Sequence, residues 1–282
     1  MSLDLERFGS QDLQKIHQYY FEHGYVIVKD VLSEALLAEF TREYSRLVEI
    51  NLKKAEIVPS LTTKDLYFIS EGVKLLEKAD HAWVSDIYDI SAMLPSFLNI
   101  VSNSITLDVI RNLLQTSAPL YPFTNRVRID PPSDNRRTYG WHQETFYTIP
   151  RSSFVQTWAP LIYDVRSENG TISVADGSHK EGIPKQSWSE IPGGATQILI
   201  SDEIVSKYSQ IQMEMNVGEV LFFSGRLAHK SGENVSKNVR FSLVGMYHDV
   251  SVKDFIAPSI EFKHKHGDAK EYFEKEMEKF RI

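Results

Sequence analysis

The feature that most constrains the fold is a series of short segments rich in β-branched and aromatic residues in the second half of the chain. Turn residues separate these segments, which cover residues 125–130, 141–149, 154–165, 171–174, 211–216, 219–223 and 239–247. Several short strands divided by turns are typical of a β-sandwich or a small barrel. Few of the segments alternate with helical patterns, which argues against a doubly wound parallel sheet.

The N-terminal part of the chain follows a different pattern, which predicts mostly helix. Apolar residues recur at helical spacing at residues 13–21, at residues 33–49 and, with a break near Pro95, at residues 85–114. A short β-branched run at residues 25–31 predicts one strand among these helices.

The length of 282 residues suits one domain with helical additions. We expect a mostly helical part at residues 1–119 and a β-rich core at residues 120–250. An irregular insertion at residues 180–207 should interrupt this core. Residues 251–282 should form a polar tail that ends in a surface helix.

Composition and charge exclude several classes of protein. The absence of cysteine removes disulfide scaffolds, Cys-ligated zinc, iron–sulfur clusters and thiol catalysis, so any metal site must use His and carboxylate ligands. A formal net charge of −7 without a basic block argues against nucleic acid as a partner. No apolar stretch approaches a membrane span and the acidic N-terminus does not resemble a signal peptide, so we expect no membrane partner and a cytoplasmic location.

Three residues of the β-rich region form a candidate metal site. His142 and Glu144 are two positions apart in a predicted strand, so their side chains should point to the same face. His229 follows the hairpin predicted at residues 217–223 and becomes a third ligand if its loop closes over the first strand. Two His and one carboxylate on one face leave positions open for a cosubstrate and dioxygen, which is the facial triad of non-haem Fe(II) oxygenases.

Two further residues point to a cosubstrate that carries a carboxylate. Arg240 comes eleven residues after His229 and opens the last predicted strand, and a planar guanidinium is a natural partner of a carboxylate. Ser231 lies two residues after His229 and can donate its hydroxyl to the same carboxylate. A surface salt bridge for Arg240 and a turn role for Ser231 are the alternatives.

A group of arginines precedes the metal motif. Arg126 and Arg128 share one face of a predicted strand, and Arg136 and Arg137 lie in the loop that follows. At the mouth of a barrel, Arg126, Arg128 and Arg137 would hold an anionic small-molecule substrate. A solvated charged edge is the alternative.

The other histidines that attract attention are expected to bind no metal. His179 lies in a turn, and His248 lies past the last predicted strand. The tract Lys263-His264-Lys265-His266 places its imidazoles between cations near a polar terminus, which is typical of solvated surface.

The order of these residues along the chain resembles the phytanoyl-CoA dioxygenase family of Fe(II)/2-oxoglutarate oxygenases. The resemblance covers most of the chain and rests on an ordered set of short motifs: Tyr19-Tyr20-Phe21-Glu22-His23-Gly24-Tyr25-Val26-Ile27-Val28, Trp141-His142-Gln143-Glu144, Trp158, Glu168-Asn169-Gly170, Gly177-Ser178-His179-Lys180, Gly218-Glu219-Val220-Leu221-Phe222-Phe223, His229-Lys230-Ser231, Asn234 and Arg240. The spacing from His229 to Arg240 makes the set specific.

The resemblance implies a mainly β fold with added helices, in which a double-stranded β-helix (a cupin-like jelly roll) carries the helical N-terminal region on its outside. It implies Fe(II) held by His142, Glu144 and His229. It implies 2-oxoglutarate that chelates this iron and places its far carboxylate on Arg240 and Ser231. The implied reaction uses O2 and hydroxylates an unactivated C–H bond of a small molecule, with release of succinate and CO2.

The resemblance also leaves alternatives open. Trp158 matches a family tryptophan that packs beside the cosubstrate, whereas Glu144 stands where the family usually has Asp. A non-catalytic jelly-roll binding protein, or a jelly-roll enzyme that uses another metal without 2-oxoglutarate, therefore remains in view. Neither the substrate, the stereochemistry nor the oligomeric state follows from the sequence. The N-terminal helices and the insertion are expected to form a lid over the site.

Overall fold

The computed structural model describes residues 5–134, 136, 138–147, 153–190, 196–255 and 275. The helices of the first part are α1 (Leu13–His23), α2 (Glu34–Lys54), α3 (Phe68–Ala79), α4 (His81–Ser91), α5 (Pro95–Val101) and α6 (Ser104–Leu114). Single residues mark several of their ends. Gly24 ends α1 in the left-handed conformation at φ 84°, the Ser33 hydroxyl accepts a hydrogen bond from the Leu36 N–H at the start of α2, and Pro95 opens α5. The predicted helices are confirmed, and α3 is an additional helix that the pattern did not predict.

Two β-sheets form the core. The larger sheet has the strand order β1-β2-β9-β4-β11-β3, and the smaller sheet has the order β10-β5-β8. The strands of the larger sheet are β1 (Arg7–Gly9), β2 (Tyr25–Lys29), β3 (Leu120–Asp130), β4 (Phe154–Pro160), β9 (Val220–Ser224) and β11 (Arg240–Asp249), and those of the smaller sheet are β5 (Ile172–Ala175), β8 (Gln210–Gln212) and β10 (His229–Ser231). A hairpin of β6 (Gln186–Ser189) and β7 (Gln197–Ile200) leads into the short helix α7 (Asp202–Val205).

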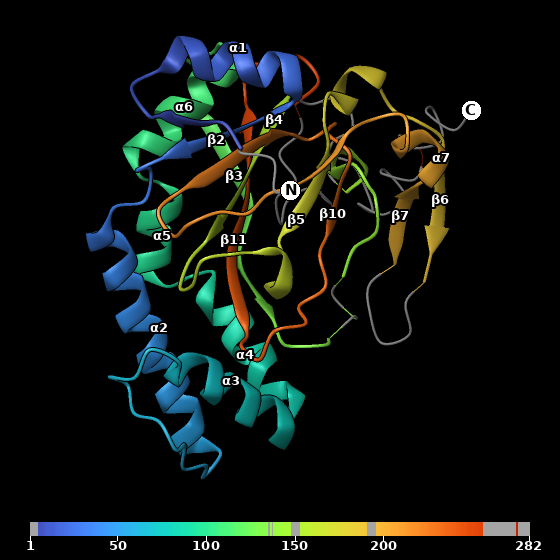
Figure 1. Ribbon diagram of the computed structural model, residues 1–282. Coiled ribbons are helices and arrows are strands. Elements are labelled where there is room, and N and C mark those ends of the chain that lie inside the picture. Colours follow the sequence, from blue (N-terminus) through green and yellow to red (C-terminus); the bar gives the residue numbers. More distant parts are fainter. Residues whose placement is uncertain are drawn as a thin grey trace.

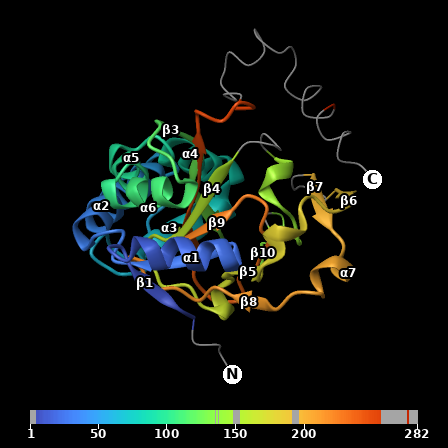
Figure 2. The ribbon, with the colours of Figure 1, turned by 90° about the horizontal axis from the view of Figure 1, so that it is seen from above.

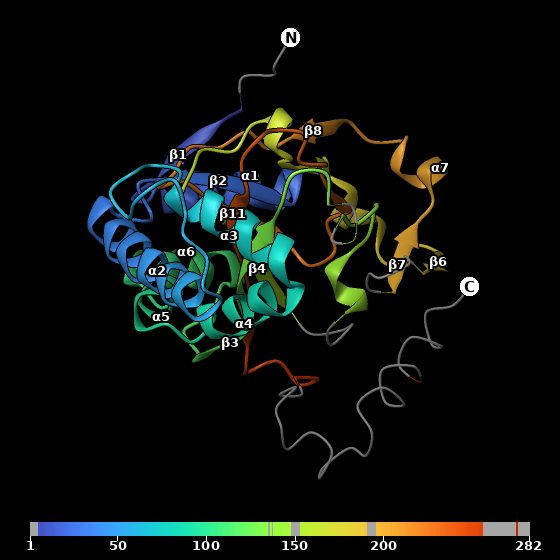
Figure 3. The same cartoon turned by 90° about the horizontal axis from the view of Figure 1, so that it is seen from below.

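The elements lie in layers (Figure 1). Seen from above, α2, α5 and α6 lie on one side of the larger sheet, and β5, β8 and β10 lie on the other (Figure 2). The β6–β7 hairpin and α7 lie beyond the smaller sheet, on the side opposite α2, α5 and α6 (Figure 3). The fold class is therefore confirmed: a jelly-roll core of two facing sheets with helices packed outside it.

Each face of the larger sheet packs against a different apolar core. Val28, Val127 and Phe222 point toward the helices, whereas Trp158 and Leu221 point toward the smaller sheet. The two cores follow from strand geometry, because successive side chains point to opposite faces. All seven residues of β4 are buried, which explains why this segment reads as a nearly continuous apolar run rather than as an alternating one.

The structure corrects three local predictions. Residues 141–147 form no strand, since His142 makes only an isolated bridge and Glu144–Phe146 form a 3-10 helix. The insertion at residues 180–207 is not irregular, because it contains the β6–β7 hairpin and α7. His248 does not lie past the last strand but inside β11, where its side chain is fully buried.

The division of the chain at residue 119 stays a prediction. Strands β1 and β2 precede this boundary and nevertheless lie in the larger sheet. The predicted C-terminal helix and the tract Lys263-His264-Lys265-His266 lie outside the described residues.

A search of the described residues for membrane spans finds no single helix that is long and apolar enough to cross a membrane. The bent pair formed by α4 and the segment Pro95–Leu114, with an angle of 55° at the break, passes the test of length and composition only when its parts are taken together.

Candidate metal centre

A backbone bridge brings two imidazoles together. His142 and His229 form an isolated antiparallel pair, in which the N–H of each residue donates to the carbonyl oxygen of the other at 3.0 Å. His229 begins β10, which is itself paired with β5. The two rings are buried, and their centroids lie 4.2 Å apart. The bridge thus fixes the spacing of two side chains that are far apart in the chain.

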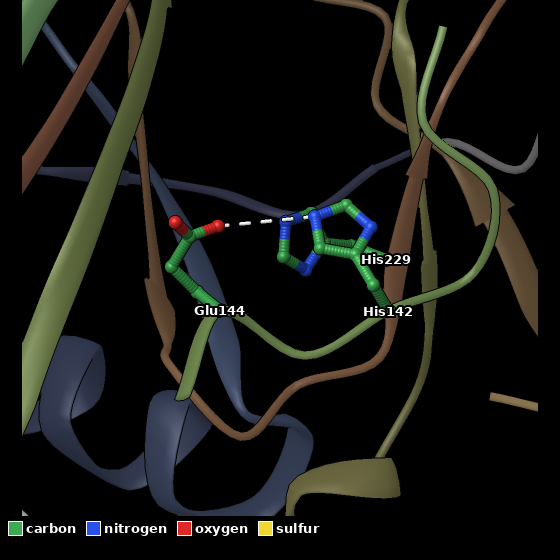
Figure 4. Close-up of side chains that lie close together, drawn as sticks. All are labelled: His142, Glu144 and His229. Carbon is green, nitrogen blue, oxygen red and sulfur yellow. Dashed lines mark ion pairs between the residues drawn. The ribbon is translucent and has the colours of Figure 1, made fainter. Parts of the chain in front are cut away.

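Glu144 reaches this pair from a turn. Its Oε2 lies 3.8 Å from Nε2 of His142, and its carboxylate points at the two rings (Figure 4). One ligand atom from each of His142, Glu144 and His229 lies within 4.8 Å of the others. The structure therefore brings the predicted trio together, although not through strand alternation.

The turn that carries Glu144 is held by the loop before β10. The Thr145 N–H donates to the carbonyl oxygen of Gly225 at 3.0 Å, and Nε2 of the buried Gln143 donates to the carbonyl oxygen of Arg226 at 2.6 Å. A Cβ on Gly225 would lie 2.0 Å from the ring of Phe154, so only glycine allows this close approach.

The hydrogen bonds of the two imidazoles leave the same nitrogen available in each ring. Nδ1 of His142 lies 2.8 Å from the carbonyl oxygen of Gly140, and Nδ1 of His229 lies 2.9 Å from that of Leu227. Because a carbonyl oxygen can only accept, each Nδ1 carries the proton and each Nε2 keeps its lone pair for a metal.

Burial and neighbouring charges set the protonation states of the cluster. Burial, assisted by the nearby His142 ring, lowers the pKa of His229 to about 3. Burial raises the pKa of Glu144, but the contact with His142 and the charges of both imidazoles outweigh it, so that this pKa lies below its usual range. A neutral imidazole beside an ionised carboxylate is the state that a divalent cation requires.

Arg240 lies in a buried network around Asp130. Nη2 and Nε of Arg240 lie 2.9 Å and 3.3 Å from Oδ2 of Asp130, and its Nη1 donates to the carbonyl oxygens of Asn169 at 3.3 Å and Gly232 at 3.4 Å. Nη2 of Arg128 lies 2.8 Å from Oδ1 of the same carboxylate. Burial alone would raise the pKa of Asp130, but the two guanidinium groups hold it well below its usual range. The alternative of a surface salt bridge for Arg240 is wrong, because its side chain is only 4% exposed.

Arg126 and Arg128 share a face of β3, as the alternation predicts, but they have different partners. The Cζ of Arg128 lies 5.8 Å from the ring centre of Tyr139, which is itself 5.5 Å from the ring of His142. Nη1 of Arg126 donates to the hydroxyl of Tyr88 on α4 at 3.0 Å. Arg128 is therefore bound to the Asp130 network near the metal cluster, whereas Arg126 belongs with α4.

The other predicted site residues have varied outcomes. Trp158 is buried in the core between the sheets. Ser231 lies on β10, and in the described part of the chain its hydroxyl makes no hydrogen bond to Arg240. Arg137 lies outside the described residues. The roles of these residues stay predictions.

The β6–β7 hairpin holds the metal-binding segment through a residue that the sequence did not mark. Gln197 on β7 is buried, its Nε2 donates to the carbonyl oxygen of Thr138 at 2.8 Å, and its Oε1 accepts from the N–H of Gly140 at 3.0 Å. The carbonyl oxygen of Gly140 is the acceptor for His142. No local pattern reveals Gln197, whereas Asp130 could have been found, since it continues the alternation of Arg126 and Arg128 on one face.

A groove of about 1140 Å³ lies away from this cluster, between α2 and residues 63–69. Its lining includes Leu37, Arg42 and Phe68 but none of the three clustered residues. The size of a cavity therefore does not mark the candidate metal centre in this protein.

Comparisons with known proteins agree with the cluster. The family described as phytanoyl-CoA dioxygenase (PhyH) matches residues 20–242. The chain is similar to the 1-deoxypentalenic acid 11-beta-hydroxylases of Streptomyces exfoliatus, at 28% identity over 235 residues, and of Streptomyces arenae, at 25% identity over 234 residues. These alignments cover 80% of this chain and 77% and 76% of the relatives.

A solved structure shows the same fold. The epimerase SnoN, in complex with Fe3+, alpha ketoglutarate and nogalamycin RO, aligns with a TM-score of 0.58 at 17% identity, over 85% of this chain and 84% of that chain. The family match spans most of the chain and includes all three clustered residues. The chain therefore belongs to the phytanoyl-CoA dioxygenase family and is an Fe(II)/2-oxoglutarate-dependent dioxygenase.

Proposed function

We propose that the protein hydroxylates a small anionic molecule and that His142, Glu144 and His229 hold its iron. The observation that carries this assignment is the convergence of three ligand atoms within 4.8 Å, with both Nδ1 atoms already bonded to backbone carbonyl oxygens. Two imidazoles and one carboxylate oxygen suit Fe(II) and leave coordination positions open. Glu144 supplies the same hard oxygen as the Asp that is usual in the family.

The remaining parts of the reaction fall to other residues of the chain. Bound iron and 2-oxoglutarate supply the oxidising chemistry, in which O2 is consumed, one oxygen atom enters the substrate as a hydroxyl group, and succinate and CO2 leave. Arg240 is the proposed partner of the far carboxylate of 2-oxoglutarate, with Ser231 as a second donor and Trp158 beside it. The burial of Arg240 supports this role, because a guanidinium shielded from water binds a carboxylate more strongly than an exposed one does.

The proposed substrate is a carboxylate or another small anion. Arg126 makes no ion pair with any carboxylate of the described residues, and Tyr88 holds its guanidinium group on the inner face of β3. A partly buried, uncompensated guanidinium favours an anionic ligand. The two Streptomyces relatives are named for an acid, which agrees with this choice. Arg137 is a further candidate from the sequence, and the cytoplasm is the expected compartment.

The test is anaerobic addition of Fe(II) and then 2-oxoglutarate to the purified protein. We expect a visible charge-transfer band only when both are present, and loss of iron binding in the His229→Ala variant. His17→Ala on α1 is the matched control, since His17 lies outside the cluster. Bound iron without a band would favour a jelly-roll enzyme that works without 2-oxoglutarate, and failure to bind iron would favour the non-catalytic alternative.

A further inference from the structure

The buried network around Asp130 contains more positive than negative charge. Asp130 accepts from Arg128 through Oδ1 at 2.8 Å and from Arg240 through Oδ2 at 2.9 Å. The network therefore combines two guanidinium groups with one carboxylate, and its net charge is +1. Asp130 and Arg240 are both buried. An uncompensated charge in such a place is costly, and an anionic ligand would remove the cost.

Arg240 cannot bind a second carboxylate through a complete fork of its own. A guanidinium group has five N–H donors. The Nε and Nη2 atoms of Arg240 face Asp130, and its Nη1 faces the carbonyl oxygens of Asn169 and Gly232. A carboxylate that arrives here therefore needs donors from neighbouring side chains.

Ser242 is one such neighbour. It lies two residues after Arg240 on β11, on the same face, and it stands opposite Arg128 in the ladder with β3. Its side chain is completely buried, and its hydroxyl has no hydrogen-bond partner among the described residues. Buried hydroxyl groups in folded proteins nearly always have a partner, so this one calls for a ligand.

Arg128 lies on the side of this network that faces the metal cluster. Tyr139 links the two, because its ring lies 5.8 Å from Cζ of Arg128 and 5.5 Å from the ring of His142. A ligand that spans from the metal to Arg240 would therefore pass the guanidinium group of Arg128.

We propose that Arg128, Ser242 and Arg240 together form the site for the far carboxylate of 2-oxoglutarate, and that Asp130 is a positioning residue that holds the two guanidinium groups. This inference rests on the proposed function, since it takes 2-oxoglutarate as the cosubstrate at this cluster. It assigns Arg128 to the cosubstrate and leaves Arg126 for the substrate.

The test measures binding rather than turnover. 2-Oxoglutarate is titrated without oxygen into the iron-loaded protein and followed by calorimetry. Arg128→Gln and Ser242→Ala should each weaken the binding of 2-oxoglutarate roughly tenfold or more, because each removes a hydrogen bond to a charged group. Arg126→Gln is the matched control, on the same face of β3, and should bind 2-oxoglutarate as the wild type does.

Ser242→Ala separates a binding role from a structural one. The hydroxyl has no partner in the free protein, so its removal should leave the unfolding temperature unchanged or raise it. Wild-type affinity for 2-oxoglutarate in either Arg128→Gln or Ser242→Ala would overturn the inference. If the wild-type protein itself binds no 2-oxoglutarate, the proposed function fails instead.

Asp130→Asn tests the positioning role. The substitution raises the net positive charge of the network, so electrostatic attraction alone predicts tighter binding of 2-oxoglutarate. If Asp130 positions the two guanidinium groups, binding should weaken. Tighter binding in Asp130→Asn would overturn the positioning role.

Discussion

The link from the β6–β7 hairpin to His142 makes a quantitative prediction for the Gln197→Met variant. Methionine keeps the length of the side chain but removes both hydrogen bonds, to Thr138 at 2.8 Å and from Gly140 at 3.0 Å. Each lost bond costs about 1 kcal/mol, and the Gly140 N–H that is left without a partner adds about 1 kcal/mol more, so the free energy of unfolding should fall by about 3 kcal/mol.

The same variant should also affect the metal. The peptide group that Gln197 holds carries the carbonyl oxygen that accepts the Nδ1 proton of His142. Loss of such an outer partner lowers metal affinity by roughly 10- to 100-fold, and the lower end is expected because the carbonyl oxygen itself remains.

Equilibrium unfolding of the metal-free protein measures the first effect, and Fe(II) titration without oxygen measures the second. Gln186→Met is the matched control, because Gln186 lies on the partner strand of the same hairpin and its side chain contacts only the carbonyl oxygen of Pro184, at 3.4 Å. If Gln197→Met binds Fe(II) as tightly as Gln186→Met does, then Gln197 supports only the fold, and the reasoning that links the hairpin to the metal is refuted.

Three further predictions concern the charged residues of the site. Glu144→Gln should lose Fe(II) affinity at least tenfold, because an ionised ligand becomes a neutral amide, whereas Glu144→Asp should retain Fe(II); equal loss in both variants by equilibrium dialysis would show that chain length and not charge matters. Arg240→Gln should raise the KM for 2-oxoglutarate by roughly tenfold or more with little change in Fe(II) affinity, and steady-state succinate release would contradict this if the KM stayed the same. Since the pKa of Asp130 is lower in the folded protein than the value of about 3.9 in an unfolded chain, its contribution to stability is present above about pH 4 and is lost as the pH falls further; acid unfolding should therefore be less steep in Asp130→Asn, and an identical pH profile would remove this role.

The sequence predicted the fold class because its signals are local. Gly24, Ser33 and Pro95 mark helix ends by their own conformational preferences. Short apolar runs between turns indicate strands that are buried on both faces. The alternation of side chains on β3 and β11 also placed Arg126 with Arg128 and Arg240 with Ser242 before any tertiary contact was known.

The sequence was less reliable where a segment depends on distant partners. His142 and Glu144 were expected to share the face of a strand, but they meet through a bridge to β10 and a turn held by Gly225. His248 was expected to lie beyond the last strand, yet its pairing with β3 and β4 extends β11 past it. In both cases the partner lies far away in the chain, so no local pattern carries the information.

By itself, then, the sequence determined which residues carry the chemistry: two imidazoles, a carboxylate and a guanidinium, in an order that is typical of one family. Only the tertiary structure decided how they are held. The ladder between β3 and β11 sets Asp130 opposite Arg240, and the β6–β7 hairpin brings Gln197 to the segment before His142. The physical reason is that residue type and spacing are properties of the chain, whereas strand register and the satisfaction of buried polar groups arise only when distant segments pack together.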